Sequence, residues 1–246
     1  MKIKEDYLLK FRNWRKIAFI LAMIGVTQYI LLCSIAMMFY PGGTELNPTI
    51  SGYSFFLNQM SDLGRIQSLS GKSNIFSMIL FMIAVVSVNL LFIPFYFAMT
   101  YFFSEKRSER LFCYLASSSE TVSALFGIGI AFLPADLYPT SHLTVTILFS
   151  IFFVIALCLV AVPIIANDSY PNRFGYGILL YAIILALYTV IVSVGLNIST
   201  EQGFLILATG QKIIIYSGFL CIFILAFGAL KRYNKLNRKS TSIITV

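Results

Sequence analysis

Six long runs of apolar residues constrain this chain of 246 residues more than any other feature of its sequence. A membrane core about 30 Å thick requires roughly 20 helical residues at a rise of about 1.5 Å each. The runs are continuously apolar and lack the alternation of barrel strands, so we expect transmembrane helices. The predicted spans cover residues 17–40, 75–103, 111–133, 142–166, 174–197 and 203–230.

The composition agrees with a membrane protein. Apolar residues make up 59% of the chain and charged residues 11%, against roughly 45–50% and about 25% in an ordinary soluble domain. The formal charge of +8 could suggest a nucleic-acid binder, but the basic residues are confined to short segments between apolar runs. We therefore predict an all-α polytopic membrane protein, one six-span domain over residues 1–246, with membrane lipids and no nucleic acid as partners.

The basic residues are distributed unevenly. Of the 18 Lys and Arg residues, all except Arg65, Lys72 and Lys212 lie before span one, between spans two and three, between spans four and five, or after span six. Cytoplasmic loops of membrane proteins carry an excess of Lys and Arg. We therefore predict a multi-pass protein of the cell membrane with both termini in the cytoplasm. The loop after span one then faces outward.

Two signals for processing occur near predicted spans. The basic N-terminal segment and the first apolar run could form a signal peptide, but the run has about 24 residues, against roughly 7–15 in a cleavable signal. We expect it to remain as span one. Residues Asn197-Ile198-Ser199 form a glycosylation sequon that lies close to the predicted outer end of span five.

The longest predicted outer segment is the loop over residues 41–74. Residues 51–60 of this loop are aromatic and apolar, but they are too few to span a membrane, so we expect a short interfacial helix there. The polar residues that follow, including Asp62 and Gly64, favour a turn.

The heptapeptide NQMSDLG, from Asn58 to Gly64, resembles the N-x-x-S-D-L-G signature of an uncharacterised multi-spanning family of archaea and bacteria, the domain of unknown function 998. A second block, Leu133-Pro134-Ala135-Asp136 followed by His142, resembles that family's F-P-x-D…H stretch. The resemblance covers most of the spans from Ser51 onward. The sequence departs from the commoner form at Gln59, where Pro is frequent, and at Leu133, where Phe is frequent.

The resemblance implies a small helical bundle with two outer-facing motifs near each other. It implies no reaction, because the activity of the family is not established. The residues that it singles out are Asn58, Ser61, Asp62, Gly64, Pro134, Asp136 and His142.

The predicted topology independently brings the two motifs together. Asp62 precedes span two, whereas Asp136 and His142 flank the turn between spans three and four, and all three belong to the outer side. Because consecutive helices in a bundle usually touch, we expect Asp62 to lie near His142 or the Asp136 turn.

Several interpretations of this outer cluster are open, including a recognition site for a ligand. The simplest is structural, with His142 bonded to one of the two aspartates and locking the outer loops. Alternatively, the carboxylates and the imidazole could hold a divalent metal, or His142 could activate Ser61 for acyl transfer. A zinc site of three histidines is impossible because His142 is the only histidine in the chain. We predict no metal and no cofactor.

Polar residues also lie deep within the predicted spans. Glu120 is about 13 residues, or roughly 20 Å, below the outer end of span three, and Asn89 has a similar estimated depth in span two. The two are therefore placed to face each other. An isolated carboxylate inside a membrane is costly, so Glu120 should be protonated, paired or beside a wet cavity. Lys212, nearer the outer surface, is a candidate partner.

The favoured function is binding of a lipid or small polar ligand at the outer cluster. The alternative is a membrane-embedded hydrolase that acts on lipid head groups, and the third hypothesis is a small transporter that uses Glu120. The candidate ligand-binding residues are Asn58, Asp62, Asp136, His142, Glu120 and Lys212. The candidate catalytic residues are Ser61, Asp62, Asp136 and His142.

Overall fold

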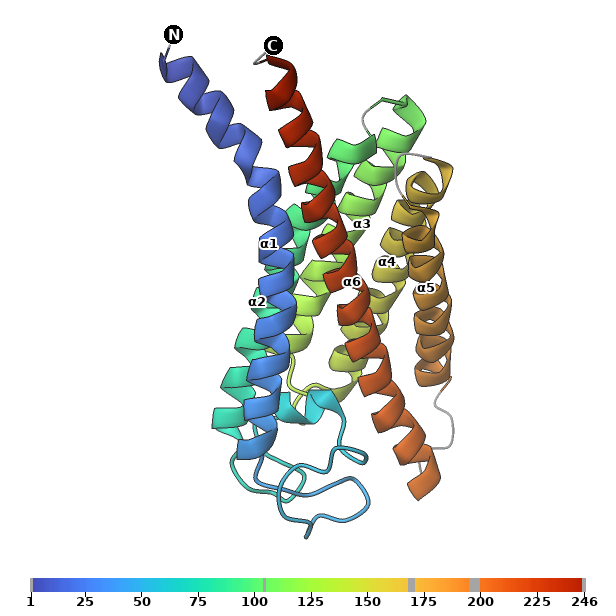
Figure 1. Cartoon of the computed structure of the whole chain (residues 1–246). Coiled ribbons are helices and arrows are strands. Elements are labelled where there is room, and N and C mark those ends of the chain that lie inside the picture. Colours follow the sequence, from blue (N-terminus) through green and yellow to red (C-terminus); the bar gives the residue numbers. More distant parts are fainter. Residues whose placement is uncertain (1, 104, 168–170, 195–199, 245–246) are drawn as a thin grey trace.

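The computed structural model describes residues 2–103, 105–167, 171–194 and 200–244. Its long helices are α1 (Lys2–Phe39), α2 (Ile75–Met99), α3 (Arg107–Phe132), α4 (Pro139–Ala166), α5 (Asn172–Ser193) and α6 (Glu201–Ile244) (Figure 1). Each of these six contains a stretch long and apolar enough to cross a membrane. The predicted all-α, multi-pass membrane protein is therefore confirmed. The sequon at Asn197 lies outside the described residues.

The six helices form a closed ring. Each one packs against its neighbours in sequence, and α1 packs against α6. Bulky side chains fill the inside of the ring, where Phe19 of α1 stacks edge-on against Phe95 of α2 with ring centroids 6.2 Å apart. The outer surface of the helices exposes apolar side chains such as Leu125 and Leu180. Lipid is the environment that such a surface requires.

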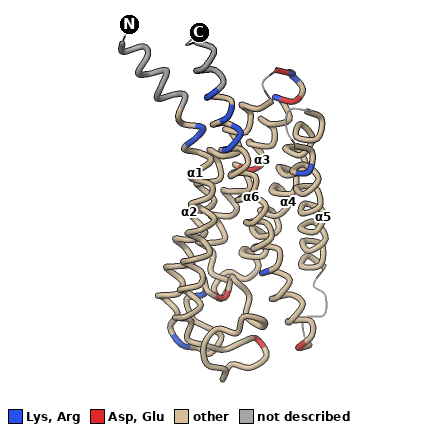
Figure 2. The backbone as a smooth tube through the Cα atoms, in the orientation of Figure 1, with Lys and Arg blue, Asp and Glu red and all other residues tan. Residues whose placement is uncertain are grey.

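The two ends of the ring differ in charge. Figure 2 shows Lys and Arg gathered at the end that carries both chain termini, which we call the basic end. The opposite end carries the segment between α1 and α2 and the turn between α3 and α4, and we call it the loop end (Figure 1). The segments that the sequence assigned to one side of the membrane therefore lie at one end of the fold.

The segment between α1 and α2 differs from the expectation in its local structure. The interfacial helix expected over residues 51–60 is not formed; these residues make turns, and a short 3₁₀ helix, η1 (Met60–Gly64), follows them. Gly52 has a φ of +72°, which is incompatible with a helix. The Asn58 side chain also accepts a hydrogen bond from the Ser54 amide at 2.9 Å, which replaces a backbone partner.

Candidate functional site

Two consecutive residues of α6 bond to the backbone of the loop. Gln211 Oε1 accepts a hydrogen bond from the Met60 amide at 2.7 Å. Lys212 Nζ donates to the Asn58 carbonyl and, at 3.2 Å, to the Ala208 carbonyl of its own helix. These bonds tether η1 and the residues before it to the side of α6.

Lys212 is buried by the loop that it binds. Only 1% of the residue is exposed, and its ammonium lies 5.4 Å from the ring centroid of Tyr53 and 5.2 Å from that of Phe55. Both rings can stabilise the cation through their faces. The candidate ligand-binding residue Lys212 is thus occupied by loop carbonyls and aromatic rings.

Asn58 is the centre of the folded loop, and its side chain is fully buried. Its Nδ2 donates to the Gly43 carbonyl at 2.9 Å and to Asp62 Oδ2 at 3.1 Å, while its Oδ1 accepts from the Ser54 amide. One amide therefore joins three separate parts of the loop. Its polar atoms are used within the protein.

Asp62 lies in η1, and it is buried as well. Besides the bond from Asn58, its Oδ2 accepts a hydrogen bond from the Gln59 amide at 2.8 Å. Burial raises the pKa of Asp62 from 3.8 to about 6, although the bonds from Asn58 and Gln59 and the charge of Arg65 act in the opposite direction. Its neighbour Ser61 is half-buried in the same turn.

This shift in the pKa of Asp62 predicts a pH dependence of stability. The folded protein binds the proton more tightly than the unfolded chain, so the stabilisation is complete below about pH 4 and is lost as the pH rises through about 6. The full effect should amount to roughly 2–3 kcal/mol. The free energy of unfolding in detergent micelles, measured across this range, should show the loss in the parent protein and not in Asp62→Asn. Parallel profiles for the two proteins would contradict the assignment.

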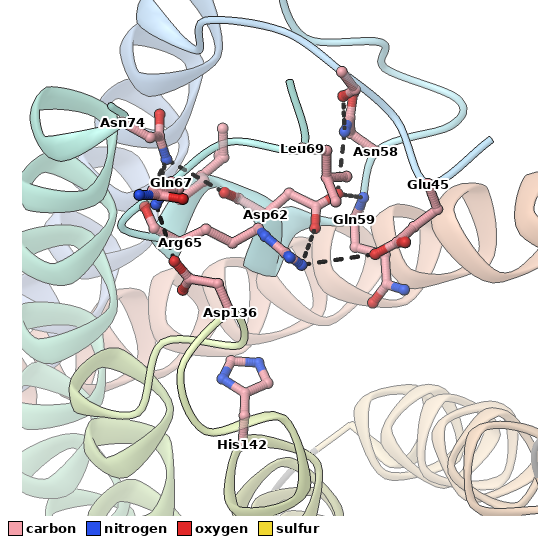
Figure 3. A network of polar contacts seen from close by, with 12 residues as sticks. Glu45, Asn58, Gln59, Asp62, Arg65, Gln67, Leu69, Asn74, Asp136 and His142 are labelled. Atoms are coloured by element: carbon pink, nitrogen blue, oxygen red, sulfur yellow. Dashed lines mark hydrogen bonds and ion pairs between the residues drawn. The ribbon is translucent and has the colours of Figure 1, made fainter. Parts of the chain in front are cut away.

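Asp136 connects the turn between α3 and α4 to the same loop (Figure 3). Its Oδ2 accepts hydrogen bonds from the Ile66 amide at 3.0 Å and from the Gln67 amide at 2.9 Å. The two outer motifs therefore meet, as the topology suggested. They meet through backbone amides that follow η1 rather than through the side chain of Asp62.

His142 makes a different bond from the one expected. Its Nδ1 lies 2.7 Å from the Leu133 carbonyl oxygen, and because a carbonyl only accepts, Nδ1 carries the proton. A neutral ring then leaves Nε2 as an acceptor. Within the described ranges, neither Asp62 nor Asp136 hydrogen-bonds to His142. The side chain lies below Asp136 and points toward the loop (Figure 3).

The guanidinium group of Arg65 has few partners. The side chain is 19% exposed, and its Nη1 lies 3.7 Å from Glu45 Oε1 and 3.8 Å from Asp62 Oδ1. Both distances exceed that of a hydrogen bond. The Nε atom is buried without a partner, and no guanidinium N–H makes a hydrogen bond to the described residues. Arg65 therefore holds several unused donors beside Asp62 and Asp136 (Figure 3).

Both aspartates and the histidine that the hydrolase hypothesis requires form hydrogen bonds to other groups instead of to one another. Asp62 accepts bonds from Asn58 and Gln59, Asp136 accepts backbone amides, and His142 bonds to a carbonyl. Over the residues that the structure describes, no three His, Cys, Asp or Glu side chains are grouped to hold a metal ion. In this part of the chain, no nitrogen of His142 makes a hydrogen bond to Ser61.

The deep polar residues do not pair as expected. Asn89 faces Gly127, where an added Cβ would overlap the Asn89 amide. Lys212 is held at the loop end by Asn58. Glu120 is 2% exposed and makes no ion pair with any described residue. The depth estimates from the sequence therefore aligned the wrong residues of α2 and α3.

Comparisons of this chain with protein-family models, with curated proteins and with solved structures gave no match. The site therefore has to be interpreted from its own geometry.

Arg65 and Gln211 are the residues that the sequence analysis left out of the site. A signal for Arg65 was present, because it is one of three basic residues on a side otherwise depleted of Lys and Arg. A basic residue on this side of the membrane, where Lys and Arg are rare, is expected to have a local binding partner. The partner can be a carbonyl, a carboxylate or an anionic ligand. The sequence marks Gln211 only as a polar residue next to Lys212 in an apolar run. Its partner could not be inferred, because Met60 is 151 positions away.

Proposed function

We propose that this multi-pass membrane protein binds a phosphate-bearing lipid headgroup at the loop end, and that Arg65 contacts the phosphate. The observation that carries the proposal is the mostly buried guanidinium without hydrogen bonds. Leaving buried donors unsatisfied costs free energy, and a phosphate offers acceptor oxygens that match the guanidinium fork. Asn58, Asp62 and Lys212 then act by holding the loop that presents Arg65.

The neighbouring groups fit a lipid headgroup. Glu45, with 44% of its side chain exposed, lies next to Arg65 and can attract an amine carried by the same headgroup. From the opposite side of the site, Nε2 of His142 can accept a hydrogen bond from an amine or hydroxyl of the headgroup (Figure 3). Phe55 and Phe56 are exposed on the same loop, and aromatic side chains favour the boundary between lipid and water.

The proposal also includes the orientation of the protein in the membrane and its family. The positive-inside rule supports placing the basic end in the cytoplasm and the loop end at the outer face of the cell membrane. The motifs at Asn58–Gly64 and Leu133–His142 support membership of the family of domain of unknown function 998. Ligand binding is preferred to hydrolysis because the candidate catalytic side chains bond to loop and turn groups instead of to one another.

The test is lipid binding by Arg65→Gln, with Lys72→Gln as its control. Lys72 is the other basic residue of the same loop, and it is exposed. In nanodiscs, binding of a fluorescent phospholipid should weaken roughly 10- to 150-fold in Arg65→Gln, which corresponds to the loss of about 1.5–3 kcal/mol from a charged hydrogen bond. Lys72→Gln should bind like the parent protein.

Two comparisons identify the group that is bound. A diacylglycerol with the same acyl chains lacks the phosphate, and it should bind no better to the parent protein than to Arg65→Gln. Inorganic phosphate should compete only if the phosphate alone is recognised. Equal affinity of the parent protein and Arg65→Gln for the phospholipid would overturn the proposal.

A further inference from the structure

Among the described residues, two buried polar atoms deep inside the helix ring have no hydrogen-bond partner. They are Oε2 of Glu120 on α3 and the hydroxyl oxygen of Tyr96 on α2. The two residues are 2% and 1% exposed. Buried polar atoms in proteins are almost always bonded, so two orphan oxygens in one interior require an explanation.

The packing of α2 against α3 brings these residues to the same level. The two helices are antiparallel neighbours, and Asn89 of α2 faces Gly127 of α3. Seven residues make about two helical turns, so residues that are seven positions apart lie on nearly the same face of a helix. The steps from 89 to 96 and from 127 to 120 therefore lead to Tyr96 and Glu120.

No described residue forms an ion pair with Glu120 that would balance its charge in the ionised state. The ionisable residues near Tyr96, besides Glu120, are Tyr181 of α5 and Cys221 of α6. The Tyr181 hydroxyl already donates to the Ile214 carbonyl at 3.2 Å. Ion pairs of the described residues occur only near the two ends of the ring, at Arg65 and Lys106.

The serines near Glu120 on α3 are occupied as well. Ser117 donates to the Cys113 carbonyl, and Ser123 donates to the Phe149 carbonyl of α4, each at 2.8 Å. Neither hydroxyl hydrogen is available to bond to the Glu120 carboxylate. The Tyr96 hydroxyl is the donor in this interior that remains unused among the described side chains.

We propose that Glu120 and Tyr96 form a proton-binding site inside the helix ring. In the protonated state Glu120 is a neutral carboxylic acid that needs no countercharge. In the ionised state its proton passes to water, and the Tyr96 hydroxyl donates a hydrogen bond to the carboxylate. The ligand of this site is a proton. The site is independent of lipid binding at the loop end.

The test is infrared difference spectroscopy of the full chain in lipid vesicles as the pH is raised. We expect a carboxylic-acid carbonyl band that disappears as Glu120 loses its proton, and that is absent from Glu120→Gln throughout. Tyr96→Phe should retain the band but lose it at a higher pH, because the ionised carboxylate no longer has its hydrogen-bond donor. A tyrosine that does not bond to the carboxylate would leave this pH unchanged.

Glu109→Gln is the matched control for the carboxylate. Glu109 is also buried on α3, but it pairs with Lys106 at 3.1 Å and accepts a hydrogen bond from Asn167 at 2.7 Å. Its replacement should leave the titrating band in place. Asp62 also titrates near pH 6, so its band is identified by its absence from Asp62→Asn. A set of titrating bands that is identical in Glu120→Gln and the parent protein, or a Glu120 band that stays constant at every pH, would overturn the proposal. If Glu120→Gln fails to fold, Tyr96→Phe decides: loss of the band at a higher pH supports the site, and an unchanged pH rejects it.

Discussion

Replacing Asn58 by alanine is expected to destabilise the protein by roughly 3 kcal/mol or more. The substitution removes the donor to Gly43 and Asp62 and the acceptor for the Ser54 amide, all at a fully buried position. The Gly43 carbonyl and the Ser54 amide then lose these bonds, and Asp62 retains the bond from the Gln59 amide. The loss should appear as a lower unfolding midpoint of the purified protein in detergent micelles.

Asn47→Ala is the control for this prediction. Asn47 lies in the same loop and its Oδ1 also accepts two hydrogen bonds, from the Thr49 amide at 3.0 Å and the Thr49 hydroxyl at 2.7 Å. Because this site is exposed, water can replace the lost acceptor, and the cost should stay below about 1 kcal/mol. Equal destabilisation by the two substitutions would contradict the buried network.

The second large effect is expected for Gly43→Ala. Gly43 has a φ of +87°, and a Cβ at this position would lie 2.9 Å from the Leu69 carbonyl oxygen and closer still to the Ser70 amide nitrogen. Because both neighbours are backbone atoms, the two sides of the loop would have to separate. Thermal unfolding should show a loss of several kcal/mol, of the size that steric overlap and lost packing cause in a core.

Gly71→Ala separates the two causes of that loss. Gly71 has a similar φ of +77°, but nothing lies within 4 Å of a Cβ at this position. Alanine there should cost only the backbone term of about 1–2 kcal/mol. The difference between the two variants then measures how closely the loop segments pack. A loss at Gly71 as large as that at Gly43 would mean that the backbone conformation alone accounts for both.

The helices could be predicted because their cause is local. A run of about 20 apolar residues has few structures available in a membrane, so length and composition are sufficient. The loop could not be predicted in the same way. The heptapeptide from Asn58 to Gly64 indicated a turn, but residues 51–60 look like an interfacial helix until the bonds from Ser54 to Asn58 and from Met60 to Gln211 are known.

The alignment of the deep residues failed for a geometric reason. Counting the depth of a residue from the end of its apolar run assumes that the ends of α2 and α3 lie at the same level. In the structure Asn89 is level with Gly127, so α2 extends farther toward the loop end than α3 does. Glu120 therefore lies beside Tyr96, whose hydroxyl is hidden in an apolar run and gave no signal of its own.

The bonds from α6 to the loop set an order of events during synthesis. The Met60 amide leaves the ribosome 151 residues before its partner Gln211, a delay of roughly 8–30 s at about 5–20 residues per second. Throughout this interval the loop lacks its α6 partners, which include Gln211 and Lys212. It reaches its final form only after α6 has entered the membrane. A protease that cleaves the open loop would thus distinguish nascent chains that have inserted α6 from those that have not.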